Sequence, residues 1–88
     1  MNHHHRKILH QIFQHPVNAN MSFRDIESVL GELGAGIENR QGSRIAVTLN
    51  GNTVVIHHGG HDVHKDEVVQ VRKFIETCGI EPARDYPL

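Results

Sequence analysis

An Asn-Gly dipeptide between two runs rich in β-branched residues constrains this chain more than any other feature. The first run is Arg-Ile-Ala-Val-Thr-Leu at 44–49, and the second is Asn-Thr-Val-Val-Ile-His at 52–57. Asn-Gly favours a two-residue type I′ turn, because both positions of that turn need positive φ. We therefore predict an antiparallel hairpin with Asn50 and Gly51 at its tip.

A two-residue loop also determines which residues of the two strands face each other. Side chains alternate between the faces of a strand, so one face of the hairpin is apolar. That face is predicted to hold Ile45, Val47, Val54 and Ile56. In the same register Arg44 lies opposite His57 on the other face, at the open end of the hairpin.

Two amphipathic helices can cover the apolar face. One begins at Ser22, which with Asp25 forms a capping-box-like start, and ends at Gly34. The other runs from Val63 or Lys65 to Cys78, and Gly79 and Ile80 give it a Schellman-type ending. Their apolar stripes are Phe23, Ile26, Val29, Leu30 and Leu33, and Val68, Val71, Phe74, Ile75 and Cys78.

The remaining segments are shorter. A small helix is predicted over residues 7–15, stopped by Pro16 and followed by a loop to residue 20. The three histidines at 3–5 are expected to be native and disordered. A short strand is predicted at 37–40, with a tight turn at Gln41-Gly42, a flexible loop at 58–61 and a loose tail at 81–88.

These elements predict an α+β fold of order α-α-β-β-β-α. Its two-layer sandwich has a three-stranded antiparallel sheet with the helices on one face. The 88 residues suffice for one domain, with residues 1–21 as an N-terminal extension and 22–82 as the core.

Composition limits the surroundings of the protein. The formal charge is −1, although nine histidines could change it, so no strong basic field indicates nucleic acid. The single Cys78 cannot form an internal disulfide, which suits a reducing compartment. No apolar run approaches the ~20 residues needed to span a bilayer. We expect a cytoplasmic protein without a membrane partner.

The segment Arg40-Gln41-Gly42-Ser43-Arg44 and the order of elements around it resemble the HicA family of toxin–antitoxin modules. The similarity covers roughly residues 22–82. It includes the approach Leu33-Gly34-Ala35 to the first strand, Val55-Ile56-His57, and the closing helix that ends at 75–80. The resemblance implies a fold like a double-stranded RNA-binding domain. It also implies cleavage of mRNA without metal or cofactor, and a cognate antitoxin as partner.

The family's catalytic residue is a His directly after Gly-Ser, where this chain has Arg44. Arginine stays protonated and is a poor general base, but its fork of donors can bind phosphate. His57 matches a His at the end of the family's third strand and is the candidate catalytic residue. Arg40, Ser43 and Arg44 are candidate RNA contacts.

Two further sets of residues have both a functional and an ordinary interpretation. Lys65 and Arg72 on the last helix could contact RNA phosphate, or could belong to a solvated face with interleaved acids. Histidines 57, 58, 61 and 64 could hold a metal. Gly59-Gly60 interrupts the helical spacing that such ligands need, so we predict no metal site.

Two functional classes follow. The first is a HicA-like endoribonuclease toxin. The alternative is a non-catalytic module that binds RNA or protein and has kept the fold without the catalytic His. Position 44 separates the two, since a His there would favour the enzyme.

Overall fold

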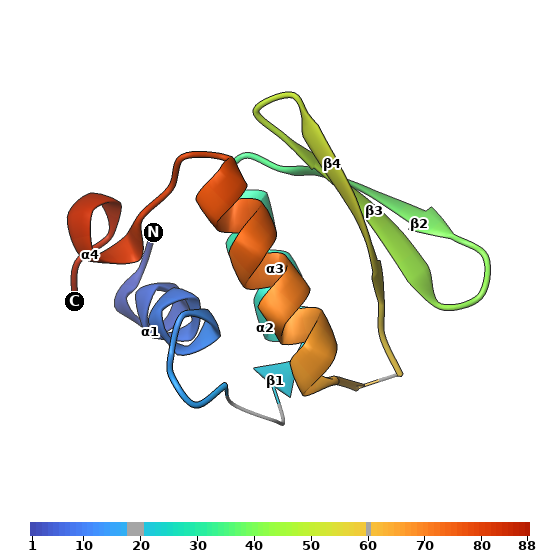
Figure 1. The fold of residues 1–88 in the computed structure, drawn as a ribbon, viewed down its shortest axis with the longest axis horizontal. Helices are drawn as coiled ribbons and strands as arrows, with labels where there is room; N and C mark the ends of the chain where they lie inside the picture. Colours follow the sequence, from blue (N-terminus) through green and yellow to red (C-terminus); the bar gives the residue numbers. More distant parts are fainter. Residues whose placement is uncertain (18–20, 60) are drawn as a thin grey trace.

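A three-stranded antiparallel sheet in the order β2-β3-β4 forms one layer, and α2 and α3 cover one of its faces (Figure 1). The computed structural model describes residues 1–17, 21–59 and 61–88. The elements are α1 (His3–Ile12), β1 (Met21–Ser22), α2 (Phe23–Glu32), β2 (Gly36–Arg40), β3 (Arg44–Leu49), β4 (Asn52–His57), β5 (Asp62–Val63), α3 (Lys65–Thr77) and α4 (Pro82–Asp85). The predicted α+β sandwich is confirmed.

The predicted hairpin register is confirmed at every position. Arg44 pairs with His57 and Leu49 with Asn52, and the four pairs between them also match. Asn50 and Gly51 have φ of 50° and 79°, as a type I′ turn requires. The short strand at 37–40 is also present, begins at Gly36 and pairs with β3.

The core lies between the sheet and the helices. Ile45, Val47 and Ile56 are fully or almost fully buried, while Val54 is only partly buried against the same cluster. The buried faces of α2 and α3 contribute Ile26, Val29, Leu30, Val68, Val71, Phe74 and Ile75. On the side of these helices away from the sheet lies α1, whose Leu9 and Ile12 are completely buried (Figure 1).

Helices α2 and α3 both end in Schellman motifs, as predicted for α3. Gly79 has a φ of 84° and its N–H donates to the Glu76 carbonyl, while the Ile80 N–H donates to Ile75. At α2 the Gly34 N–H donates to the Gly31 carbonyl, and the Ala35 N–H donates to the Leu30 carbonyl. Glycine therefore stops each helix by taking up a left-handed conformation.

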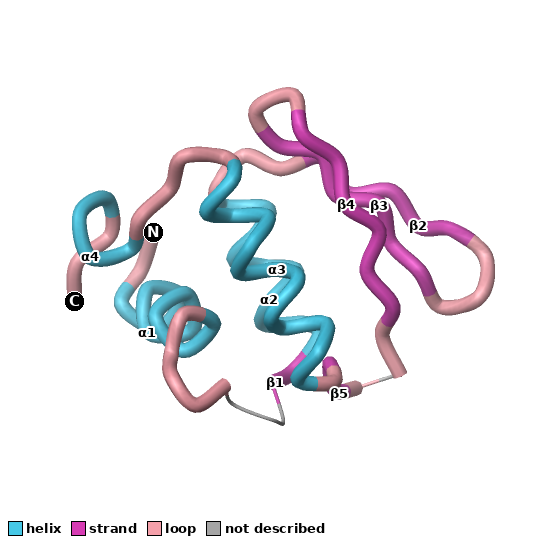
Figure 2. Tube along the Cα trace, in the orientation of Figure 1, coloured by secondary structure: helices cyan, strands magenta, loops and turns pink. Residues whose placement is uncertain are grey.

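The start of α2 differs from the prediction. Ser22 does precede the helix, but its side chain makes no capping hydrogen bond, so the capping-box expectation is wrong. Ser22 instead belongs to β1, which pairs with β5, and the Phe23 N–H donates to the His61 carbonyl at 2.8 Å. Backbone pairing thus satisfies the N–H of Phe23, the first residue of the helix. Figure 2 shows this small sheet at one end of α2 and α3.

The N-terminal histidines are ordered in the structure, which corrects the expectation of disorder. They form the first turn of α1, and the Asn2 side chain accepts a hydrogen bond from the His5 N–H at 2.8 Å. An Asn at this position is a favourable helix start. The helix ends at Ile12, earlier than predicted, and positions 18–20 of the predicted loop lie outside the described residues.

The C-terminal segment is not a loose tail. It forms α4, and Arg84 donates to the Gly79 carbonyl at 2.9 Å. The His10 side chain bonds the Tyr86 carbonyl at 2.8 Å, which joins α1 to the end of the chain. The loop predicted at 58–61 contains a bridge between Gly59 and Asp62, while residue 60 lies outside the described part.

The hairpin tip is attached to the end of α3. The Asn50 side-chain amide donates to the Cys78 carbonyl at 2.9 Å, and the Cys78 thiol donates to the Leu49 carbonyl at 3.3 Å. These contacts fix the turn of the hairpin, which is the end far from Arg44. Among the described residues, no helix has both the length and the apolar character needed to cross a membrane.

Replacing Ile45 by Ala should lower the free energy of unfolding by ~2–5 kcal/mol, because the side chain is completely buried in the core. Chemical denaturation measures this. The control is Val55→Ala on β4, whose side chain is 37% exposed and should cost about 0.5 kcal/mol or less. Equal costs for the two variants would contradict the assigned faces.

The hydrogen bonds from the Arg84 side chain and from the Glu81 N–H lower the pKa of Asp85 to about 2. Because this pKa is lower in the folded state than the unfolded value of ~3.9, the ionised carboxylate stabilises the C-terminal turn at pH values above ~3.9. That stabilisation is lost as the pH falls toward 2. Carboxyl carbon shifts should show a midpoint near 2 for Asp85, raised in Arg84→Gln. A wild-type midpoint near 4 would disprove the contact.

Candidate functional site

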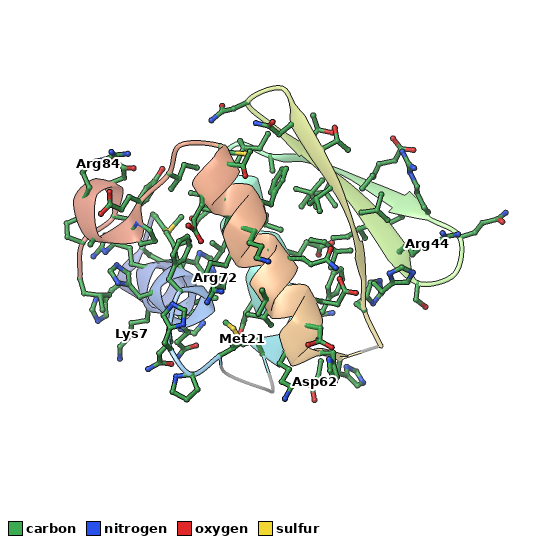
Figure 3. All side chains as sticks on the ribbon, viewed as in Figure 1. Lys7, Met21, Arg44, Asp62, Arg72 and Arg84 are labelled. Carbon is green, nitrogen blue, oxygen red and sulfur yellow. The ribbon has the colours of Figure 1, made fainter. Side chains whose placement is uncertain are left out.

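Three side chains form a row across the open end of the sheet. Arg44 on β3 pairs with Arg40 on β2 and with His57 on β4, so all three lie side by side. Because the neighbouring Ile45 and Ile56 point into the core, the row lies on the face away from α2 and α3, which we call the open face. All three residues are exposed, and Figure 3 shows Arg44 at the outer end of the sheet. The predicted neighbourhood of Arg44 and His57 is therefore confirmed.

The turn between β2 and β3 supports Arg44. Gly42 and Ser43 have φ of 76° and 57°, and the Arg44 Nε donates to the Gln41 carbonyl at 2.9 Å. The guanidinium lies so close to the turn that a Cβ on Gly42 would be 3.6 Å from Nε. Within the described part of the chain its two terminal nitrogens have no hydrogen-bond partner. They can receive an anion at the surface.

Ser43 lies beside this guanidinium but does not act through its side chain in the structure. Its carbonyl accepts the His58 N–H at 3.0 Å, which extends the β3–β4 ladder by one pair beyond Arg44 and His57. This bond fixes the backbone of Ser43, an exposed residue directly before Arg44.

His57 has a neighbour that sequence reasoning missed. Its Nδ1 lies 3.8 Å from Glu67 Oε1, and its backbone N–H donates to Glu67 Oε2 at 3.4 Å. Glu67 is in the first turn of α3, and its side chain is 19% exposed, whereas that of His57 is 63% exposed. The sequence placed Glu67 on a solvated face, and no local pattern indicates that it reaches β4.

The next histidine is used for packing. The His58 ring stacks on Phe23 of α2, with ring centres 3.9 Å apart and planes at 13°. Its Nδ1 is buried and has no partner among the described residues. Beside it is an open hollow of about 490 Å³. The residues that line it are His57, His58, Gly59, Asp62, Val63, His64, Asp66 and Glu67.

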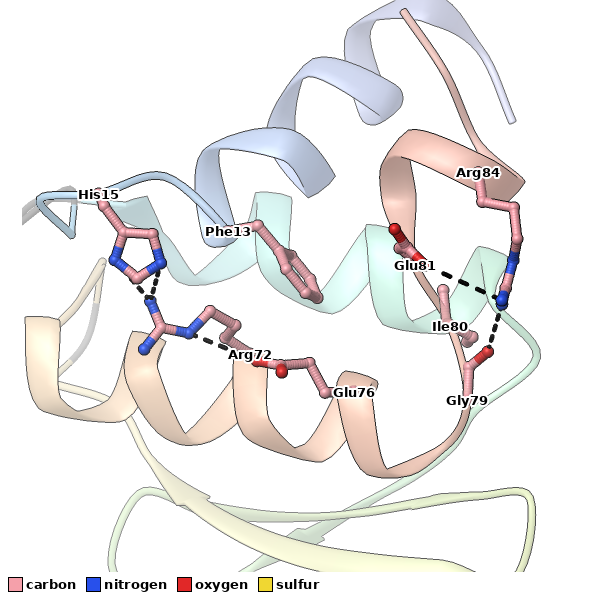
Figure 4. A pocket seen from close by; sticks show the side chains of 8 residues that line it. All are labelled: Phe13, His15, Arg72, Glu76, Gly79, Ile80, Glu81 and Arg84. Atoms are coloured by element: carbon pink, nitrogen blue, oxygen red, sulfur yellow. Dashed lines mark hydrogen bonds and ion pairs between the residues drawn. The ribbon is translucent and has the colours of Figure 1, made fainter.

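The two candidate RNA contacts on α3, Lys65 and Arg72, lie in different places relative to the row. Lys65 is exposed at the first position of α3, the end of the helix that also carries Glu67. Arg72 lies two turns further along, pairs with Glu76 at 3.6 Å and contacts His15 at 3.4 Å. Figure 4 shows it in a separate hollow that Phe13, Ile80 and Arg84 also line. That hollow is on the α1 side of α3, away from the open face, so Arg72 is not near Arg44.

No group of three or more His, Cys, Asp or Glu side chains in residues 1–17, 21–59 and 61–88 is arranged to hold a metal ion. Two histidines of the 57–64 segment make other contacts. His58 stacks on Phe23, and His64 caps α3 by accepting the Asp66 N–H at 3.3 Å.

The row and the neighbouring Glu67 thus bring together two arginines, an imidazole and a carboxylate. Such a set can bind a phosphodiester and exchange a proton beside it. Comparison of the chain with protein-family models, curated proteins and solved structures found no significant match. The residues and their geometry therefore carry the functional argument.

Proposed function

We propose that this chain is a HicA-like toxin: a cytoplasmic RNA-binding protein that cleaves mRNA without a metal or other cofactor. The observation that carries the proposal is the pairing of Arg44 with His57 at the open end of the hairpin. It brings an anion-binding group and a proton acceptor together, as cleavage of a phosphodiester requires.

Cleavage would proceed by attack of a ribose 2′-OH on the adjacent phosphorus. His57 takes the proton of that hydroxyl as general base, and the bond between phosphorus and the 5′-oxygen of the next nucleotide breaks. The leaving 5′-oxygen takes a proton from water, so the products are a 2′,3′-cyclic phosphate and a 5′-hydroxyl. Arg44 holds the phosphate through its terminal nitrogens, since its Nε is occupied by Gln41. A guanidinium fork suits the two non-bridging oxygens, on which negative charge builds.

Glu67 is the positioning residue for this base. The carboxylate faces Nδ1 of His57 at 3.8 Å, which leaves the other ring nitrogen, Nε2, for the substrate. A carboxylate behind an imidazole selects the orientation in which the other nitrogen faces the substrate. The other proposed RNA contacts are Arg40 in the row, Ser43 in the turn before Arg44, and Lys65 at the start of α3.

Arg72 supports the proposal less well than the sequence suggested. Its side chain is 14% exposed and is occupied by Glu76 and His15. An RNA strand bound to the open face would not reach it directly. We therefore assign it a structural role between α1 and α3.

The partner proposed for this chain is a cognate antitoxin that covers the open face. An exposed row can be silenced by occlusion alone, without a change in the toxin. Co-purification with the product of the adjacent gene, followed by protection mapping, tests this. Protection of Arg44 and His57 is expected, whereas protection confined to α1 would contradict occlusion.

A non-catalytic binding module is the second candidate. It is favoured by Arg44, which stands where the family has its catalytic His, and by the 63% exposure of the His57 side chain. In that case the row binds RNA or a protein partner without chemistry. Induced expression in a bacterial host, scored by growth arrest and RNA decay, separates the two candidates.

His57→Ala should abolish RNA cleavage and leave RNA affinity nearly unchanged, because a neutral imidazole adds little to phosphate attraction. Glu67→Gln should slow cleavage to an intermediate rate. Cleavage of a labelled RNA in the presence of chelator measures both. The control is His4→Ala, which removes an exposed imidazole from α1. Full activity of His57→Ala would assign the base elsewhere.

Arg44→Ala should weaken both RNA binding and cleavage, because it removes the phosphate clamp. The slope of log affinity against log salt should fall by about one phosphate contact. Lys7→Ala, which removes one exposed positive charge from α1, is the matched control and should keep the wild-type slope. Equal slopes for the two variants would show that Arg44 does not contact phosphate.

A further inference from the structure

β2 is an edge of the sheet, and its hydrogen-bonding pattern shows which backbone groups remain unused. The His58 N–H donates to the Ser43 carbonyl. The backbone N–H and carbonyl groups of the odd-numbered residues of β3 therefore point toward β4, and those of the even-numbered residues point toward β2. Glu38 therefore bonds Ala46, and Arg40 bonds Arg44. The N–H and carbonyl groups of Ile37 and Asn39 point away from the sheet.

This edge is open to a partner. No described strand pairs with the outer side of β2, and its residues are exposed except for the half-buried Ile37. In Figure 1 β2 lies at the border of the molecule, away from the three long helices. An uncovered row of backbone donors and acceptors is a template for strand pairing.

The charges along β2 are arranged symmetrically around one residue. Glu38 and Arg40 flank Asn39 and lie on the same face, with 3.9 Å between Glu38 Oε1 and Arg40 Nε. Their side chains are 75% and 51% exposed, so both can turn outward. Reversing the strand direction about Asn39 exchanges the negative position with the positive one.

We infer that β2 pairs antiparallel with β2 of a second copy of this chain, about a two-fold axis through Asn39. The Asn39 backbones of the two copies exchange both hydrogen bonds. Glu38 of each copy then lies opposite Arg40 of the other, so two ion pairs flank the axis on the open face.

Other symmetric registers are less favourable. An axis through Glu38 places the two Glu38 carboxylates directly opposite each other, and like charges in that position are destabilising. An axis through Ile37 places Glu38 opposite Gly36, which leaves both charged residues without a partner. Charge complementarity therefore selects Asn39.

The contact joins two sheets into one of six strands, with both open faces on the same side. The Arg40, Arg44 and His57 rows of the two copies then share one continuous surface. Because the paired segment is short, the association is weak and depends on concentration, as for other small interfaces. It needs no RNA, so its failure leaves the proposed function untouched.

Light scattering or sedimentation at low salt tests the inference. The mass should rise above the monomer value of 9.9 kDa as the concentration increases. Glu38→Arg and Arg40→Glu should each remain monomeric, because each places like charges opposite one another. An equimolar mixture of the two variants should associate, since every facing pair is then complementary.

The charge-swapped double variant E38R/R40E should also associate by itself, and circular dichroism should show all variants folded. Three results would overturn the inference: a wild-type protein that stays monomeric, single variants that associate like wild type, or a mixture that does not recover association. The second result would also be expected for an axis through Glu38, where each single change keeps like charges opposed.

Discussion

The left-handed turn at Asn50 and Gly51 is the constraint on which the remaining structure depends. A turn of two residues permits one register between β3 and β4, and a slip of one residue would move every side chain to the other face. With the observed register, Ile45 and Ile56 enter the core together. The same register brings Arg44 and His57 together on the open face. One local backbone preference thus determines both the core and the candidate site.

Contacts with α3 hold the hairpin at both ends. At the tip, Asn50 and Leu49 bond the residue that ends α3, while at the open end Glu67 of the first turn bonds the His57 N–H. The helix therefore holds the hairpin in place at both of its ends. This explains why a carboxylate from a separate element lies beside His57, at a position that the strand pattern alone does not indicate.

Local patterns predicted the parts of the fold that local chemistry determines. The hairpin register followed from Asn-Gly, and the ends of the long helices followed from glycine. The pairing of β1 with β5 did not, because two-residue strands have no periodicity and depend on contacts between distant segments. The helical state of the N-terminal histidines was missed for a related reason. A short helix gains its stability from packing, here through Leu9 and Ile12, rather than from propensity.

The candidate site shows the same division. Arg44 and His57 could be predicted as neighbours, since a two-residue turn places the paired residues of a hairpin by simple counting. Arg72 could not be separated from them by sequence, because its position depends on the side of α3 that α1 covers. Glu67 was hidden for the opposite reason: its spacing fits an ordinary solvated helix face.

The three strands of the sheet are not equally attached to the rest of the molecule, so β4 is more restrained than β2. The hairpin contacts α3 at its turn through Asn50 and at the end of β4 through the His57 N–H, whereas β2 pairs with β3 alone among the described strands. From these contacts we expect backbone displacements to be smallest at β4 and to grow toward β2. His57 lies on β4, Arg44 on β3 and Arg40 on β2, so each arginine lies one strand further from the β4 edge. In the proposed function, the imidazole of His57 would therefore act from the more restrained strand, and the two arginines would contact RNA from the less restrained strands.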